Sequence, residues 1–347
     1  MELSRTINSD KRYYLDENTI ENTASFLQTM RVFNDAKIDL YNALYDQKYL
    51  ASGPLIDHAY PVFLKEKYKT NDYYNAAVYS AASGSISSQK ELKKYYSTTI
   101  TADLKTRDEK IQMIQEALDK KKAVKNSIRI YRKDGRWVTP YPRCQLKVKG
   151  LMIVLFNKTV VKLDEYERSV EADIRKLKTR LALVTEARKR KEKKLENIKN
   201  LPPERIVFGG KKLYSEKDTV GITKSAEDNK TSQKALKEWK QEFFEKRHQS
   251  MALPGRHTSK YGNFLCKYDG KDLSVTCIDG TTTVFHDFKL PRYNEAFQNN
   301  FTCKPEDRQS ICYNFTVKRD RKNRQYIIVS VTMKLQAYEN SYYGNGA

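Results

Sequence analysis

A heptad pattern in the middle of this 347-residue sequence constrains its fold more than any other feature. Nine positions between residues 170 and 198 follow one another at alternating four- and three-residue steps, and seven of them are aliphatic: Val170, Ile174, Leu177, Leu181, Val184, Leu195 and Ile198. The spacing predicts one long helix over residues 163–200, packed in a bundle or an antiparallel pair. The other two positions are Arg188 and Lys191. We therefore expect uneven burial, with the helix facing solvent or a phosphate backbone near Arg188.

The charge balance indicates the kind of partner. Lys and Arg number 65 against 43 Asp and Glu, a net charge of +22. Such a surplus repels itself in a compact chain and usually has a polyanionic partner. Nucleic acid ranks first and an anionic membrane surface second. No stretch has the roughly 18 apolar residues that would span a bilayer, and the N-terminus lacks a secretory apolar core, which predicts a cytoplasmic protein without a membrane partner.

The basic residues are concentrated in three segments. Residues 128–150 hold seven bases and one acid, residues 175–199 eleven and three, and residues 318–324 five and one, so these segments contain 18 of the 22 surplus charges. That distribution predicts a groove that follows phosphates, although any single basic run is usually a solvated face. The candidate nucleic-acid-binding residues are Arg129, Arg132, Lys133, Arg136, Lys147, Lys149, Arg188, Lys189, Arg190, Lys191, Lys194, Arg205, Lys211, Lys212, Arg319, Arg321, Lys322 and Arg324. Trp137 and Tyr141 are candidates for stacking on bases, or for packing inside a hairpin.

The first 127 residues predict a helical lobe, whose first residues could form a strand of a later β lobe. One helix runs from Phe26 to Leu44, with Lys37 as the polar gap in its apolar face, and ends before Gly53-Pro54. Further helices are expected near 73–82 and over 88–125, where a capping box at Thr106 allows a break. Residues 128–162 predict a basic, non-helical hairpin or extended insert.

The second half changes its apolar period. Residues 201–260 predict a linker region with a short helix near 233–249, and residues 261–347 predict strands. Asp269-Gly270 and Asp279-Gly280 separate three short strands, and a longer hairpin follows around residues 311–333. We expect these strands to close into a small antiparallel barrel of oligonucleotide-binding type. The fold class is therefore α+β: a helical recognition lobe with a long basic helix, then a β-barrel lobe.

Residues for catalysis or metal binding do not form a recognisable set. The four histidines are scattered, and the five cysteines lie far apart without a Cys-x-x-Cys pair, as expected for free thiols in a reducing compartment. Gly209-Gly210-Lys211-Lys212 lacks the spacing of a phosphate-binding loop. We expect no catalytic residues, no metal site, no cofactor and no enzymatic activity for this chain.

One segment resembles a known family. The sequence RIVFGGKKLY at 205–214, which follows a long basic helix, is similar to the hallmark of the TnpB-like proteins, the insertion-sequence OrfB relatives of type V CRISPR effectors. Residues 70–92 and the closing hairpin are similar to weaker family patterns. The resemblance implies recognition and wedge lobes that hold a guide RNA and target DNA, where base pairing reads the target sequence.

The family also has a RuvC nuclease domain and a zinc ribbon, and Mg and Zn are expected only for those missing parts. The resemblance therefore implies a prokaryotic or phage-encoded RNA-guided module that has no nuclease domain of its own and could work with a separate RuvC-containing chain. Tyr338, Tyr342 and Tyr343 would lie at an edge where such a domain packs. The alternative is a non-catalytic phage or plasmid DNA-binding protein that assembles through its long helix.

Overall fold

The computed structural model describes residues 2–52, 59–155, 157–217 and 226–336, and it confirms the mixed α+β class. The chain divides into two compact units. The first unit comprises residues 1–88 and 204–347, and the second comprises residues 89–203. This division differs from the predicted one at residue 127, because the N-terminal helices and the C-terminal strands share one core. The predicted edge at Tyr338, Tyr342 and Tyr343 and the break at Gly53-Pro54 lie outside the described residues.

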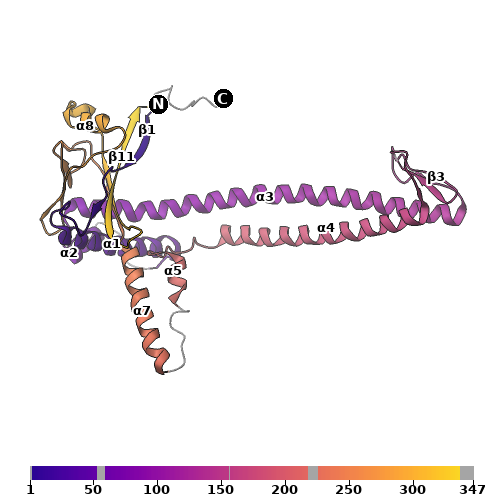
Figure 1. The fold of residues 1–347 in the computed structure, drawn as a ribbon, viewed down its shortest axis with the longest axis horizontal. Coiled ribbons are helices and arrows are strands. Elements are labelled where there is room, and N and C mark those ends of the chain that lie inside the picture. Colours follow the sequence, from indigo (N-terminus) through magenta and orange to yellow (C-terminus); the bar gives the residue numbers. More distant parts are fainter. Residues whose placement is uncertain (1, 53–58, 156, 218–225, 337–347) are drawn as a thin grey trace. The chain divides into compact units, whose positions relative to one another are not determined.

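The second unit is an antiparallel helical arm. Helix α4 (Leu163–Asn200) confirms the predicted long helix and lies beside the part of α3 (Asp72–Asp134) that follows residue 88 (Figure 1). The prediction of separate helices near 73–82 and over 88–125 was wrong, because α3 is continuous over 63 residues, and the break that was allowed at Thr106 does not occur. Thr106 directs its hydroxyl to the carbonyl of Ala102 inside the helix and caps nothing. Residues 128–134 are also helical, contrary to prediction.

A small three-stranded sheet joins the two helices of the arm. Strands β3 (Lys147–Lys149), β4 (Met152–Val154) and β5 (Val160–Lys162) pair antiparallel in that order. Ile153 is buried and joins a cluster with Ile128 of α3 and Val170 of α4. The predicted insert thus contains a sheet that packs on the helices through one face.

The largest sheet belongs to the first unit. Its order is β1 (Glu2–Asn8), β11 (Gln325–Gln336), β10 (Cys312–Arg319) and β6 (Ser250–Leu253), and β2 (Tyr13–Tyr14) also pairs with β11. The predicted hairpin is confirmed, and in its register Tyr313 lies opposite Val331 and Phe315 opposite Val329, all fully buried. Pairing of β1 with β11 confirms that the first residues form a strand of the β lobe.

The predicted strands between the Asp-Gly turns form a separate sheet. They are β7 (Cys266–Tyr268), β8 (Leu273–Thr276) and β9 (Thr282–Phe285). The expected closed barrel was wrong: among the described strands, β7–β9 pair only with one another apart from a bridge between Ile20 and Phe285. Turn chemistry determines local hairpins, but closing a barrel also requires a shared shear between sheets, which local patterns do not contain.

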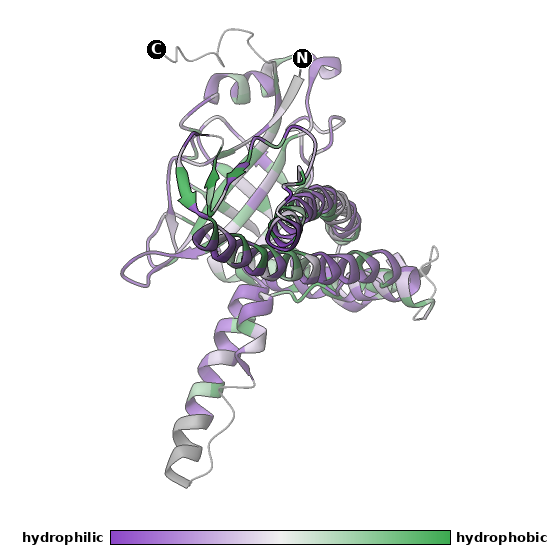
Figure 2. Cartoon of the chain, turned by 90° about the vertical axis from the view of Figure 1, so that its right-hand side faces the viewer, coloured by the Kyte–Doolittle hydropathy of each residue, from purple (hydrophilic) through white to green (hydrophobic). Residues whose placement is uncertain are grey.

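Helix α1 (Thr23–Tyr45) fills the core of the first unit and continues as a π-helical segment, η1 (Asp46–Leu50). The predicted apolar face is confirmed, and Phe26 contacts Phe285 and Phe315 edge-on at 5.2 and 5.1 Å between ring centroids. Figure 2 shows hydrophobic positions alternating with paler and hydrophilic ones along the strands of this unit, whereas the long helices are mostly hydrophilic. The core therefore lies between the sheets and α1.

The remaining elements of the first unit connect or cover this core. They are α2 (Ala59–Tyr68), α5 (Lys211–Ser215), α7 (Ala226–Arg247), α8 (Asn294–Thr302) and η2 (Pro305–Asp307). Helix α7 confirms the predicted short helix and begins seven residues before residue 233. In the described part of the chain, none of the helices is both long and apolar enough to cross a bilayer.

Candidate nucleic-acid interface

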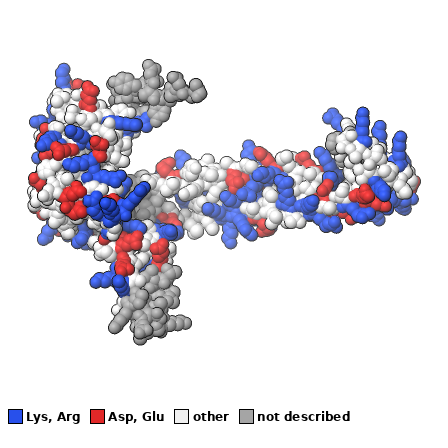
Figure 3. Space-filling view, viewed as in Figure 1, with Lys and Arg blue, Asp and Glu red and all other residues white. Residues whose placement is uncertain are grey.

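Positive charge is concentrated in the second unit. Residues 89–203 contain 31 basic and 15 acidic residues, so this third of the chain holds 16 of the 22 surplus charges. Figure 3 shows Lys and Arg side chains along the arm and gathered at the end that contains β3. The arm is therefore the main electrostatic feature of the protein.

Most of the cations at this end of the arm are exposed and make no ion pair with a described residue. Residues 128–162 contain nine bases and a single acid, Asp134. Of the predicted contact residues in this segment, Arg132 makes ion pairs, with Asp164 and with Glu167 at 2.7 Å. The others are exposed and form no ion pair with any described residue: Arg129, Lys133, Arg136, Lys147 and Lys149. Unpaired ammonium and guanidinium groups remain available for phosphate oxygens.

The aromatic residues of the insert are packed. Trp137 and Tyr141 are half-buried against the arm's small apolar cluster, and the Trp137 ring meets Tyr131 edge-on at 6.3 Å. Burial raises the pKa of the Tyr141 hydroxyl most strongly, and a hydrogen bond with Cys144 raises it further. Of the two alternatives for these rings, the structure has the packed one.

The basic seam residues of α4 are neutralised by α3. Arg188 pairs with Asp108 and Lys191 pairs with Asp103 at 3.1 Å. These contacts raise the pKa of Arg188 and lower that of Asp103. The expectation that α4 faces solvent or phosphate near Arg188 was wrong. The partner helix supplies carboxylates at these two heptad positions, which the sequence of α4 alone does not reveal.

The outer face of α4 remains basic. Lys189 is mostly exposed and makes only a within-helix pair with Glu186 at 3.3 Å. Arg190 and Lys194 are exposed and have no ion-pair partner among the residues that the structure describes. The predicted run at 188–191 therefore divides into two residues that hold the arm together and two that face outward.

The segment 205–214, which contains the sequence FGGKKL and is called the FGGKKL segment below, mainly connects elements of the first unit. Arg205 pairs with Asp46 and stacks on Tyr45 at 4.8 Å, so its charge is already engaged. Lys211 pairs with Glu204 at 2.6 Å, whereas Lys212 is exposed without an ion pair in the described residues.

Two further contacts of this segment explain its composition. The Phe208 ring meets Tyr41 edge-on at 5.1 Å, and the Tyr41 hydroxyl accepts a hydrogen bond from the Ile206 amide. A Cβ on Gly209 would lie 2.8 Å from the Phe243 ring, and the backbone there has a φ of +99°. Both constraints favour glycine.

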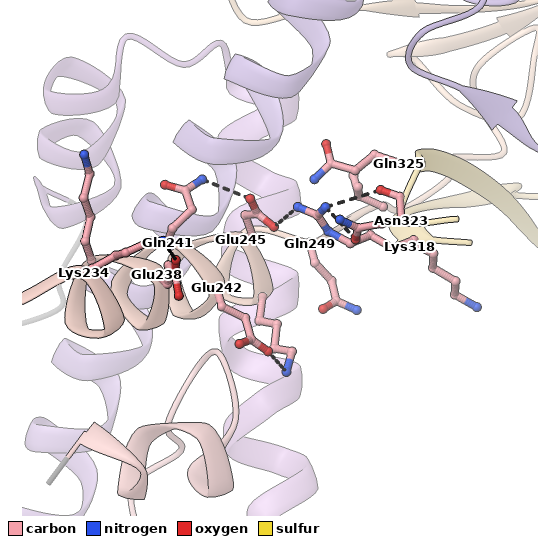
Figure 4. Close-up of a pocket in the computed structure, with 13 residues that line it drawn as sticks. Lys234, Glu238, Gln241, Glu242, Glu245, Gln249, Lys318, Asn323 and Gln325 are labelled. Atoms are coloured by element: carbon pink, nitrogen blue, oxygen red, sulfur yellow. Dashed lines mark hydrogen bonds and ion pairs between the residues drawn. The ribbon is translucent and has the colours of Figure 1, made fainter. Parts of the chain in front are cut away.

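The β10–β11 turn faces α7 across a groove of about 1130 Å³ that is lined mainly by charged and amide-bearing residues. Arg319 pairs with Glu245 at 2.6 Å, and Gln241 donates to the same carboxylate at 3.0 Å (Figure 4). Arg324 pairs with Asp320 and Glu17 and lies over Tyr14 at 4.1 Å. Arg321 and Lys322 are exposed and have no such partner in the described structure.

A basic loop of the first unit was missed by the sequence reasoning. Residues 254–262 connect β6 to the segment before β7 and expose Arg256, His257 and Lys260. These three residues among the nine of the loop are too few for composition alone to indicate a basic site. The sequence feature that could have found the loop is its two flanking glycines, Gly255 and Gly262.

Among the described residues, no group of three or more His, Cys, Asp or Glu side chains is arranged to hold a metal ion. All five cysteines are free thiols. The features that remain are the unpaired cations on the arm, on the β10–β11 turn and on the 254–262 loop. Comparison of this chain with protein-family models, with curated proteins and with solved structures found no match.

Proposed function

We propose that this protein binds nucleic acid through its helical arm, as the cytoplasmic guide-RNA- and target-DNA-holding module of a TnpB-like, RNA-guided system. The observation that carries the proposal is the division of the cations into two classes. Those in the seam of the arm, and Arg132 at its end, are neutralised by carboxylates of the facing helix. The other predicted contact residues at its end, and Arg190 and Lys194 on its outer face, make no ion pair with a described residue. Holding the two helices of the arm together explains the cations of the first class, but it does not explain those of the second.

A polyanion accounts for the second class. Binding of phosphates releases counterions, so unpaired cations gain more from a nucleic acid than cations that must first leave a carboxylate. The resemblance of residues 205–214 to the TnpB-like hallmark supports the RNA-guided form of the proposal. The alternative, assembly through α4, is less favoured because the α4 seam already faces α3 within the same chain.

The salt dependence of binding tests the electrostatic part. We expect affinity for a 20-nucleotide RNA to fall about 10³-fold or more between 50 and 200 mM salt. Changing four unpaired cations to Gln should lower the slope of log K against log salt by up to about 2.8, at about 0.7 per phosphate contact on a single strand. The four are Arg136, Lys147, Lys149 and Arg143, which is likewise exposed and makes no ion pair with a described residue.

The matched control removes four exposed but ion-paired lysines of the first unit: Lys67, Lys234, Lys246 and Lys271. Its net charge equals that of the test variant, and its slope should stay near that of the unchanged protein. Equal slopes for all three proteins would place the interface away from the arm end and contradict the proposal.

Sequencing the RNA that copurifies with the protein tests the RNA-guided part. One protected RNA species, enriched over total cellular RNA, supports a guide. A random sample of cellular RNA would restrict the function to nonspecific binding. The proposal also implies that the purified protein does not cut DNA in Mg²⁺, which incubation with a matched RNA and plasmid would check.

A further inference from the structure

A pocket of about 260 Å³ lies in the first unit, between the first turns of α3 and the basic loop 254–262. Tyr73, Ala76 and Ser80 line it from the helix, and Arg256 and Phe264 line it from the loop side. Sites for drug-sized ligands have roughly 300–1,000 Å³. This volume therefore suits a single planar ring system better than a larger ligand.

The loop that forms one wall is held rigidly. The buried Asn263 side chain donates to the carbonyls of Leu253 and Ile311 at 3.0 and 3.1 Å and accepts from the amide of Leu265 at 2.9 Å. A Cβ on Gly255 would lie 2.3 Å from the Ile311 nitrogen, so the backbones are in close contact there. A loop fixed in this way can present its side chains without a large ordering cost on binding.

The pocket contains an aromatic platform. The rings of Tyr73 and Phe264 are stacked, with centroids 4.6 Å apart and planes 20° apart. Phe264 covers one face of Tyr73, and Tyr73 is 45% exposed and borders the cavity. Small side chains at Ala76 and Ser80 leave the space beside the ring open. A flat aromatic ligand would extend this stack.

Positive charge surrounds the pocket. Arg256 borders it, and His257 and Lys260 are exposed on the same loop. None of the three makes an ion pair with a described residue. We propose that this pocket accepts one unstacked nucleobase of a bound strand, stacked on Tyr73, while Arg256 and Lys260 contact the flanking phosphates. The inference rests on the proposed nucleic-acid binding and adds a second contact site, which would recognise a base instead of a phosphate.

The test compares two tyrosines of the same helix. Tyr73 and Tyr79 are almost equally exposed, at 45% and 46%, but only Tyr73 borders the pocket. In the full chain, Tyr73→Ala should weaken binding of 20-nucleotide RNA or DNA single strands roughly 5- to 100-fold, the range for loss of one base–aromatic stack. Tyr79→Ala should stay within about twofold. Separate RNA and DNA arms identify which strand supplies the base.

A fully abasic 20-nucleotide DNA strand separates stacking from fold damage. On this probe Tyr73→Ala and the unchanged protein should bind equally, because the base that Tyr73 holds is absent. Ser80→Phe, which fills the pocket from an exposed position and keeps Tyr73, should repeat the loss on normal strands, and Tyr73→Trp should retain binding. Arg256→Gln should reduce the salt slope by about one phosphate contact.

The outcomes are distinct. If the unchanged protein binds no strand, both the proposed function and this inference are overturned. If it binds but Tyr73→Ala behaves as Tyr79→Ala, or loses as much affinity for the abasic strand, the pocket is not a base site although the proposed function stands. Loss by both Tyr73→Ala and Ser80→Phe on base-containing strands alone supports the inference.

Discussion

Lys37 occupies a core-facing position of α1, between Phe33 and Leu40. Its ammonium group donates to the side-chain oxygen of Asn34 at 2.6 Å and lies 5.3 Å from the centre of the Phe208 ring. Burial lowers its pKa from 10.5 to about 8. The residue that interrupts the apolar face in the sequence is therefore a partly desolvated cation beside the FGGKKL segment.

We expect Lys37→Met to stabilise the protein at pH 7, by up to about 3 kcal/mol, since each unit of pKa shift corresponds to about 1.36 kcal/mol. The folded state releases the proton near pH 8 and the unfolded state near 10.5, so the stability of the unchanged protein rises with pH in that window. The gain should therefore shrink between pH 8 and 10.5. Urea unfolding of both proteins at pH 7 and 10 measures it, and equal stability at pH 7 would contradict it.

His286 links two distant parts of the first unit. Its ring nitrogens lie 2.9 Å from an Asp272 oxygen and 3.1 Å from a Glu21 oxygen. The hydrogen bond with Asp272 is the largest cause that raises its pKa above 6.5, and Lys11 donates to its backbone carbonyl.

Because the folded pKa of His286 is raised, its contribution to stability is fully present below about pH 6.5 and is lost as pH rises through the folded value. We expect His286→Gln to melt at a lower temperature than the unchanged protein at pH 5.5. The difference should disappear at pH 8.5. Thermal unfolding at both pH values measures it, and a difference that grows with pH would show that the charge of His286 is not the cause.

At the scale of elements, the arm has a charge pattern that selects one register. Among the described residues, six ion pairs join its helices along their length: Asp103–Lys191, Asp108–Arg188, Lys121–Asp173, Lys125–Glu171, Arg132–Asp164 and Arg132–Glu167. In every pair except Arg132–Glu167 the two residue numbers sum to 294 or 296, as an antiparallel pair in a single register requires. Helix α3 supplies the acids near its middle and the bases further on, so a slipped register would bring like charges together.

This pattern predicts that charge order matters more than charge number. Arg188→Glu should lower the melting temperature of the arm, because the introduced carboxylate would face those of Asp108 and Glu192. Combining it with Asp108→Arg should restore much of the loss, since the pair is re-formed in the opposite sense. Circular dichroism at 222 nm on melting measures both. An arm that melts alike in all three proteins would show that the apolar contacts alone determine the register.

At the scale of the whole molecule, the two units have separate cores and different charge. The core of the first unit is drawn from residues before 89 and after 203, whereas the cluster of the second lies within 124–174. The first and last residues of the arm in the sequence lie close together, because the Lys93 ammonium group donates to the Leu201 carbonyl at 2.9 Å.

We therefore expect that replacing residues 90–202 with a short Gly-Ser linker leaves a protein that still unfolds cooperatively. Its net charge falls strongly, because the arm contains most of the surplus. Its salt slope for RNA binding should fall by more than half. Cooperative melting with an unchanged salt slope would assign binding to the first unit, and loss of cooperative melting would show that the arm supports that core.

Local patterns were sufficient wherever one element determines the outcome. The apolar face of α1, the length of α4, the Asp-Gly hairpins and the β10–β11 hairpin all follow from periodicity and turn residues within a few positions of each other. These features depend on side chains that repeat along one helix or strand, so the sequence contains the whole signal.

Other outcomes required the tertiary structure. Whether a lysine or arginine is available to a phosphate depends on which carboxylate lies opposite, and Asp108 is 80 residues from Arg188 in the sequence. The open arrangement of two sheets, in place of a barrel, depends on how their strands stagger. The sequence by itself determined the helices, the hairpins and the excess of charge, because these are local or additive. Only the folded chain decided which charges are neutralised and which rings border a pocket, because those are properties of residues that meet from distant positions.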